Sequence, residues 1–208
     1  MNQRFEFEAG EFELFDSFAQ RILSDYPPSQ YFYVGVGRSP AVLMAILASR
    51  SPENWANLPA SAAKWMTFYK LENPDSEVVT HFNRFLPTTE TLGGRKVLLI
   101  DHVQSGLGLK NVKSLAQGIL GRNHVDSLVV VQEEALENHR YLLSDGGHFA
   151  MTYEEEAQLT RFASERYDHV AQYGEAVLTR DLELLADVSE NPGHQSLLDA
   201  VRERLNQD

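Results

Sequence analysis

Two stretches of this chain repeat one pattern: an apolar run of strand-forming residues, a glycine-containing turn, and then apolar residues at helical spacing. The runs are apolar at consecutive positions, as expected of strands that are buried on both faces. A third such run follows the second helix. The strands are predicted at Tyr31–Val36, Lys96–Asp101 and Asp126–Gln132, and the helices from Pro40 to about Arg50 and over Leu109–Leu120. This alternation predicts an α/β fold with an open parallel sheet and helices on both faces.

Helical patterns also flank this part of the chain. Phe12, Phe15 and Ile22 recur at helical spacing, which predicts a helix over Glu11–Tyr26. The stretch Ser51–Pro87 gives no clear elements. Further helices are expected over Tyr153–His169, Gly174–Val188 and Gln195–Leu205. We therefore expect an α/β core over residues 1–150 and a C-terminal helical hood or cap over residues 151–208, within one compact unit.

The composition limits the partners of such a fold. The 208 residues carry 18 Lys and Arg against 30 Asp and Glu, a formal net charge of −12. This charge repels polyphosphates and anionic lipids, so we expect no general nucleic-acid binding and no membrane docking. Any anion site is expected to be a local pocket of backbone amides and one or two cations. The chain has no cysteine, which excludes disulfides, thiolate zinc sites and a thiol nucleophile.

The sequence also gives an expectation about the compartment. The longest apolar stretch, Pro40–Ala48, is well short of the roughly 20 residues that cross a bilayer. The segment Met1–Phe15 carries several acids and lacks the apolar run of a signal peptide. We therefore expect a cytoplasmic protein.

The first glycine-containing turn, Gly35–Pro40, has the residue types of an anion-binding loop. Glycine allows the backbone to approach an anion closely, and the following helix offers free amides and the positive end of its dipole. Gly35 and Gly37 are also spaced as the first two glycines of the dinucleotide-binding fingerprint. However, Pro40 stands in place of the third glycine of that fingerprint. Glu53 lies close to the spacing expected of its ribose-binding acid, but in a turn without a strand before it. A third interpretation is a plain connection between strand and helix.

The second turn follows a strand that ends in Asp101 and His102. Its residues can wrap a phosphate monoester with successive N–H groups and one hydroxyl, while the helix dipole adds attraction. Lys110 lies in the first helical turn, where its positive charge is disfavoured by the helix dipole. Either an anion bound nearby compensates for this charge, or Lys110 is simply a solvated lysine. The residues of this turn are Gln104, Ser105, Gly106, Leu107, Gly108 and Leu109. Because ligands bind parallel sheets at the carboxyl ends of the strands, both turns are expected at one site.

The segment Val97–Leu109 resembles the phosphoribosyl pyrophosphate motif of the type I phosphoribosyltransferases. Gly37, Arg38 and Ser39 resemble the short pyrophosphate loop of that family, so the resemblance covers about residues 30–132. It implies a phosphoribosyltransferase-like fold. It also implies a reaction at the anomeric carbon of a 5-phosphoribosyl substrate, either phosphoribosyl pyrophosphate or a nucleotide.

The resemblance implies a role for each motif residue. Ser105 to Leu109 would cradle the ribose 5-phosphate. Asp101 would bind the ribose hydroxyls and stabilise the positive charge that develops on the sugar. Arg38, with the amides around Ser39, would hold the pyrophosphate. Mg²⁺ would be held through the substrate, with Asp101 as the one candidate protein contact.

Three departures from the family pattern leave two functions open. His102 stands in place of the second acid, and Gly108 stands in place of the last Thr of the phosphate loop. No segment matches the sequence of the mobile catalytic loop, whose expected place is within Tyr69–Glu90. His102 would act as a general base, an orienting donor or a packed residue. The first function is a divergent enzyme of the phosphoribosyltransferase type. The alternative is a non-catalytic regulatory protein that binds a nucleotide or phosphosugar. In either case the C-terminal helices would serve as a cap or as a homodimer surface.

The remaining polar residues give weaker patterns. The seven histidines lack the paired helical spacing of a zinc site. The segment Ser144–His148 has the composition of a turn, and a triad of Ser144, Asp145 and His148 would need a geometry that the sequence does not indicate.

Overall fold

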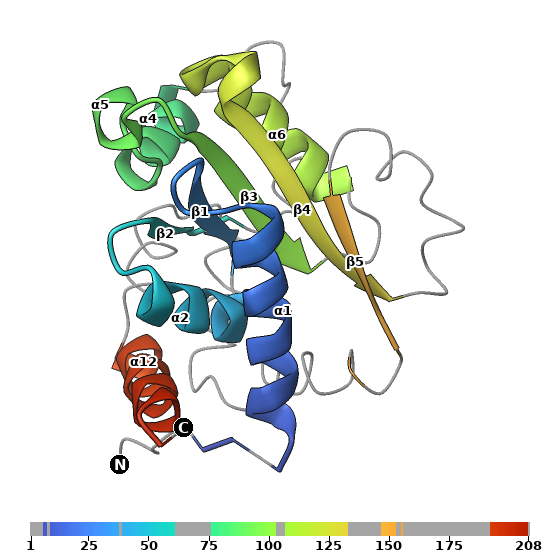
Figure 1. The fold of residues 1–208 in the computed structure, drawn as a ribbon. Coiled ribbons are helices and arrows are strands. Elements are labelled where there is room, and N and C mark those ends of the chain that lie inside the picture. The colour runs from blue at the N-terminus through green and yellow to red at the C-terminus, as the bar shows by residue number, and fades with distance from the viewer. Residues whose placement is uncertain are drawn as a thin grey trace.

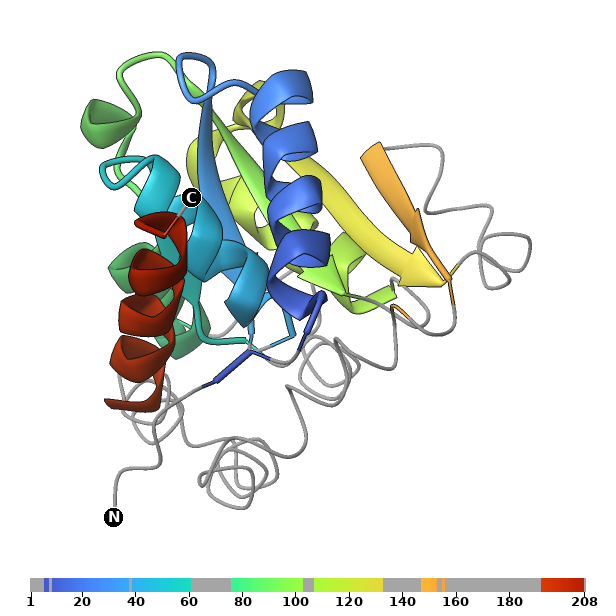
Figure 2. The ribbon, with the colours of Figure 1, turned by 60° about the horizontal axis from the view of Figure 1, so that its bottom comes forward.

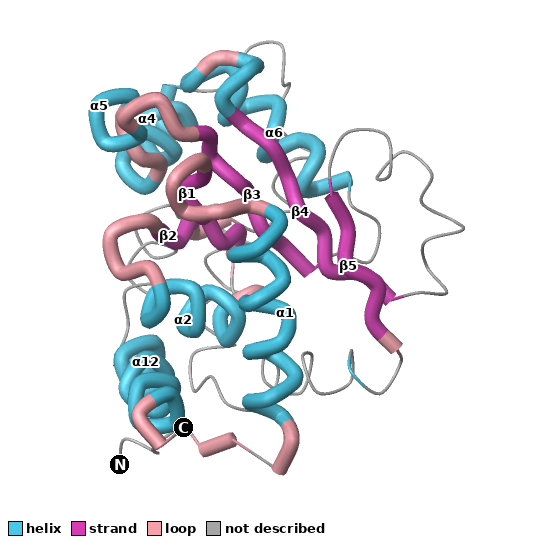
Figure 3. The backbone as a smooth tube through the Cα atoms, viewed as in Figure 1, coloured by secondary structure: helices cyan, strands magenta, loops and turns pink. Residues whose placement is uncertain are grey.

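The fold is a single five-stranded parallel sheet, seen in a computed structural model (Figure 1). The structure describes residues 6–7, 9–37, 39–60, 76–102, 107–132, 147–152, 155 and 192–207. The strands are β1 (Tyr31–Val36), β2 (Trp55–Leu58), β3 (Lys96–His102), β4 (Val125–Gln132) and β5 (Gly147–Met151). Their order across the sheet is β2-β1-β3-β4-β5 (Figure 3). Every neighbouring pair is parallel. The predicted α/β architecture is therefore confirmed.

Helices cover both faces of this sheet, as Figure 2 shows from a second direction. One face packs against α1 (Glu11–Asp25), α2 (Ala41–Arg50) and α12 (Pro192–Leu205). The other packs against α4 (Ser76–Phe85), the short α5 (Thr89–Leu92) and α6 (Leu107–Leu120). A 3₁₀ turn, Arg122–His124, leads into β4. Among the described residues, no helix combines the length and the apolar character needed to cross a membrane.

The central strands are apolar at consecutive positions because each face of the sheet has its own core. In β3, Val97 and Leu99 pack toward α4 and α6, whereas Leu98 and Ile100 pack toward α1 and α2. All four side chains are fully buried. This is the burial expected of a parallel strand that is covered on both sides, where side chains alternate between faces.

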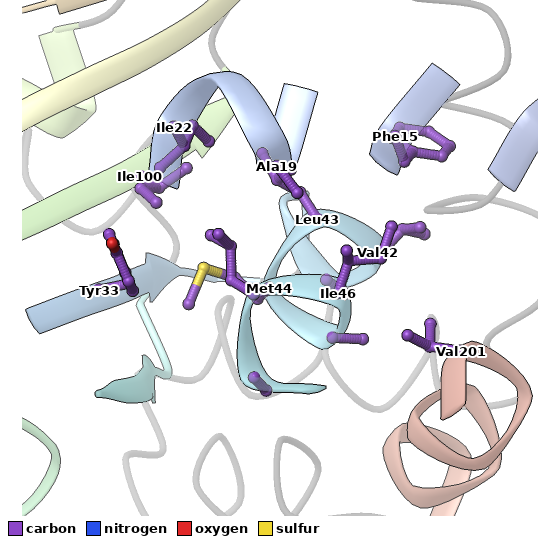
Figure 4. Packing of buried hydrophobic residues seen from close by; sticks show 14 of the residues in the cluster. Phe15, Ala19, Ile22, Tyr33, Val42, Leu43, Met44, Ile46, Ile100 and Val201 are labelled. Carbon is purple, nitrogen blue, oxygen red and sulfur yellow. The ribbon is translucent and has the colours of Figure 1, made fainter. Parts of the chain in front are cut away.

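Helix α2 is the most deeply buried helix of the described chain. All residues from Ala41 to Ala48 are buried, because the sheet covers one side of the helix and α1 and α12 cover others. Figure 4 shows Met44 directed toward β1, where Tyr33 lies, with Val42 and Ile46 on the parts of the helix nearer α1 and α12. The nearly unbroken apolar sequence of this segment thus reflects burial in the core.

The C-terminal helix α12 belongs to the same face as α1 and α2. Its Leu197, Leu198 and Val201 are buried in the core on that face. At its far end, Arg204 forms an ion pair with Glu13 of α1 at 2.6 Å. The helix begins at Pro192, three residues before the predicted start, because proline suits the first turn of a helix. The other two predicted C-terminal helices lie outside the described residues.

Two strands occur where the sequence did not predict them. β2 lies within the stretch Ser51–Pro87 that gave no clear elements, and β5 includes the end of the predicted turn Ser144–His148. Gly147, the first residue of β5, lies against the Tyr26 ring, and a side chain at this position would collide with the Tyr26 hydroxyl. His148 is an exposed residue of that strand, while Ser144 and Asp145 lie outside the described residues.

Candidate functional site

The strand order creates a reversal point between β1 and β3. From β1 the chain crosses through α2 to β2 on one side, and from β3 it crosses through α6 to β4 on the other. Because α2 and α6 cover opposite faces, the chain leaves the two central strands in opposite directions. Open α/β sheets bind ligands at such a point, outside the carboxyl ends of the strands.

Both glycine-containing turns begin at this reversal point. Gly35 of β1 lies opposite Ile100 of β3, so the next residue of each strand, Val36 and Asp101, are neighbours at the carboxyl edge. The strands that lead into the two turns therefore end side by side at one edge, and the meeting of the turns themselves stays a prediction. Arg38 of the first turn, and Gln104, Ser105 and Gly106 of the second, lie outside the described residues.

The first turn begins after β1 at Gly37, and residues of β2 stabilise the conformation of Gly37 by hydrogen bonds. Gly37 has a φ of 70°, in the left-handed region that favours glycine. Its N–H donates to the Leu58 carbonyl at 2.9 Å. The Asn57 amide lies against the carbonyls of Gly35 and Gly37, which accept hydrogen bonds only, so its nitrogen is assigned to this side and donates to them at 3.0 and 3.1 Å. These three hydrogen bonds define where the chain departs from the sheet.

Helix α2 then begins beside this turn with buried amides. Pro40 precedes it as the capping residue, and its side chain makes no capping hydrogen bond. Ala41, Val42 and Leu43 are buried, and the first turn of the helix holds no acid. The first amides of a helix lack partners within the helix and carry partial positive charge. Half-buried Ser39 lies directly before them, so this end of α2 suits an anion.

Asp101 is a buried carboxyl at the end of β3. It is 5% exposed, and its neighbour across the sheet is Val129 of β4, itself buried. The alternation of the strand places Asp101 in the same set as Val97 and Leu99. Burial raises the pKa of Asp101 well above its usual range, and a hydrogen bond from the backbone N–H of His102 opposes this shift. A cation nearby would favour the ionised form.

His102 belongs to the opposite set of β3 side chains. It is the last residue of the strand, half-buried, and lies opposite Val130 of β4. Val130 packs in the core on the side of α1 and α2, so the alternation assigns His102 to that face and Asp101 to the other. Adjacent in sequence, the two side chains thus differ in the environment that they face.

The second turn enters α6 earlier than predicted. The helix begins at Leu107, so Leu107, Gly108 and Leu109 form its first turn instead of preceding it. Leu109 is 2% exposed and packs in the core with Val112, so its side chain serves packing and only its backbone N–H remains for an anion. Lys110 is exposed one position later.

Two residues that the sequence analysis missed stabilise the end of β2. Asn57 is the first, and the signal available for it was a single amide side chain in an otherwise apolar run. The second is His81 of α4, a buried imidazole whose Nε2 lies 2.7 Å from the carbonyl oxygen of Pro59. Its ring packs against Phe85, with centroids 4.9 Å apart. The end of β2 is thus hydrogen-bonded to the turn that follows β1, and Pro59, directly after β2, contacts His81 of α4.

Comparisons of the chain with protein-family models, curated proteins and solved structures found no match. The chemistry of this edge must therefore be argued from its own residues.

Proposed function

We propose that this protein is a divergent enzyme of the phosphoribosyltransferase type. It would act at the anomeric carbon of a 5-phosphoribosyl substrate, either phosphoribosyl pyrophosphate or a nucleotide. The observation that carries the proposal is the position of Asp101, a buried carboxyl at the end of β3, beside the start of the first turn on β1. A carboxylate at this place suits a reaction in which positive charge develops on a sugar.

With phosphoribosyl pyrophosphate, the proposed reaction breaks the bond between the anomeric carbon and the pyrophosphate oxygen. The electron pair leaves with the pyrophosphate, while an acceptor or water bonds to the carbon and releases a proton to the solvent. Asp101 would face the forming cation, whose charge favours the ionised carboxylate despite its burial. Arg38, Ser39 and the first amides of α2 would stabilise the negative charge on the pyrophosphate. The residues from Ser105 to Leu109 would hold the ribose 5-phosphate.

Mg²⁺ fits this arrangement as an ion held mainly by the substrate. In phosphate-binding sites Mg²⁺ takes one or two carboxylates, and phosphate oxygens and water complete its coordination. Asp101 supplies one carboxylate at this edge, while the described residues hold no group of three or more His, Asp or Glu side chains able to form a protein cage. When bound, Mg²⁺ would neutralise charge on the leaving pyrophosphate.

The proposal extends to the setting in which the enzyme works. The small proportion of basic residues supports a small phosphosugar or nucleotide as the partner, in preference to nucleic acid. A cytoplasmic location and a homodimer formed through the C-terminal helical part belong to the same proposal.

The test is turnover. The protein is incubated with phosphoribosyl pyrophosphate, Mg²⁺ and a pool of nucleobase and amine acceptors, and pyrophosphate release is measured. We expect release that depends on Mg²⁺ and falls at least about a hundredfold in Asp101→Asn, the scale typical of losing one preorganised electrostatic group. Release that is unchanged in Asp101→Asn would contradict the proposal.

The alternative is a regulatory protein that binds the same ligand without turnover. It is favoured by His102 at the position of the family's second acid, because a neutral imidazole cannot replace a carboxylate beneath a forming cation. Saturable binding of phosphoribosyl pyrophosphate without release of pyrophosphate would support this alternative.

The variant His102→Asp separates the two functions further. It restores the second carboxylate, and if the site is a weakened transferase we expect pyrophosphate release to rise at least about tenfold. A folded His102→Asp variant that loses all activity would instead assign His102 to proton transfer.

A further inference from the structure

The first turn, Gly35–Pro40, is stabilised by a residue outside both motifs. Asn57 lies on β2, directly opposite Gly35 of β1. With its nitrogen assigned to this side, its amide donates to the carbonyls of Gly35 in β1 and of Gly37 just after the strand, at 3.0 and 3.1 Å. Gly37 is the last described residue before Arg38. Asn57 therefore controls the start of the turn from the neighbouring strand.

The two hydrogen bonds demand an amide at this position. Gly35 and Gly37 are both buried, so loss of the Asn57 donor leaves two buried carbonyls without this partner. A carboxylate has the same shape as the amide but accepts hydrogen bonds only. Asp at position 57 would direct oxygen toward oxygen at 3.0–3.1 Å and push the Gly37 carbonyl away.

We propose that Asn57 is a positioning residue for the leaving pyrophosphate, an inference that rests on the proposed function. By fixing Gly37, it sets the path of the chain toward Ser39 and the first amides of α2, which the proposed function assigns to the pyrophosphate. The ribose 5-phosphate is assigned to the second turn, which follows β3, whereas the described hydrogen bonds of the Asn57 side chain go to Gly35 and Gly37. Asn57 thus governs affinity for one end of the substrate and not for the other.

The test compares the same substitution at two positions of one segment. Asn57→Asp is paired with Asn54→Asp, which lies just before β2, at its other end, where the Asn54 side chain donates to Ser51 Oγ at 2.9 Å. Binding of inorganic pyrophosphate with Mg²⁺, and of ribose 5-phosphate, is measured by calorimetry on the full chain. We expect Asn57→Asp to weaken pyrophosphate binding roughly ten- to a hundredfold, because small misplacements at a site cost that much. Binding of ribose 5-phosphate should change less than about twofold, and Asn54→Asp should leave both unchanged.

Each other outcome overturns a stated part of the argument. If the unaltered protein binds neither ligand, the proposed function fails and this inference fails with it. If it binds both, and Asn57→Asp either matches Asn54→Asp or weakens both ligands equally, only the role of Asn57 is overturned. Should Asn57→Asp not fold, Asn57→Ser is measured by the same criteria, because it keeps one shorter donor without adding charge.

Discussion

Gly35 shows how one residue can be assigned to a ligand by sequence and to packing by structure. It lies within β1, and a Cβ atom there would be 2.5 Å from Met44 Cγ and 3.2 Å from the Asn57 side chain. The glycine therefore allows α2 to pack closely on the sheet. Its spacing from Gly37 suggested the first glycine of a dinucleotide fingerprint, and the close approach of α2 gives a physical reason for the glycine that requires no ligand.

Gly35→Ala is expected to destabilise the fold by about 1–3 kcal/mol, the usual cost of overpacking a core. The control is Gly118→Ala in α6, where a Cβ has nothing within 4 Å and alanine favours the helix. That variant should gain about 0.5–1 kcal/mol. Urea unfolding of both variants measures the difference. Equal stabilities would show that Met44 moves aside freely.

Asp101 should make the stability of the protein depend on pH. Its pKa is raised in the folded state by burial, so the folded protein keeps a proton that the unfolded chain has already lost. This shift in pKa lowers the stability of the folded protein. The loss of stability is absent below the unfolded pKa of about 3.9, grows as the pH rises toward the folded pKa, and is constant above it. Asn at this position carries no charge and escapes this loss.

We therefore expect Asp101→Asn to be more stable than the unaltered protein at pH 7 by at least about 1 kcal/mol, with a smaller difference at pH 4. Denaturant unfolding at the two pH values measures it. Because the change in shape is the same at both, the pH dependence isolates the charge. A gain in stability with a loss of pyrophosphate release would identify Asp101 as a residue kept for function at a cost in stability.

At the scale of elements, α6 carries a lysine where its dipole disfavours one. Lys110 is exposed in the first turn of the helix, near the end at which the resemblance puts the ribose 5-phosphate. Lys110→Gln is expected to stabilise the free protein slightly, by about 0.3–1 kcal/mol. It should also weaken binding of ribose 5-phosphate several-fold, an effect that shrinks at high salt.

The matched control is Lys113→Gln, which lies one turn further along the same helix. It should leave the affinity for ribose 5-phosphate within about twofold, because the dipole and the proposed phosphate act only over the first turn. Calorimetry of both variants at low and high salt measures the effect. If the two lysines behave alike, the second turn does not hold the phosphate.

The elements that could be predicted are those whose own sequences show a pattern of apolar residues. β1, β3 and β4 are apolar at consecutive positions, and α1 and α6 show helical spacing. β2 has four residues, only one of them fully buried, and includes Asn57. β5 is an edge strand that begins with a glycine packed under Tyr26. Both depend on contacts with distant segments, which no local pattern contains.

The same distinction holds for the site. Asp101 and Gly37 could be predicted to share an edge, because each follows an apolar strand and parallel strands end together. The role of Asn57 could not, because it depends on β2 lying beside β1. The start of α6 at Leu107 likewise could not be predicted, because it depends on the packing of Leu109 in the core. Leu109 therefore belongs to the helix and not to the loop in which it was expected.

For the molecule as a whole, the last helix completes the layer that supports the first turn. α12 lies against α2, whose N-terminal end borders the candidate site (Figure 1). The ion pair between Glu13 and Arg204 joins α12 to α1 across most of the chain's length. Leu197 has an exposed fraction of 0%, whereas both members of the ion pair are more than 40% exposed. Packing, and not charge, should therefore hold the helix in place.

Leu197→Ala is expected to lower the free energy of unfolding by about 2–5 kcal/mol, because it leaves a cavity between α12 and the core. Glu13→Gln, which removes the ion pair and keeps the shape, should leave the unfolding midpoint nearly unchanged, since both side chains stay largely in water. Urea unfolding of the full chain compares the two. A small loss for Leu197→Ala together with a large one for Glu13→Gln would mean that α12 is held by its charged end and that the core of the sheet is complete without it.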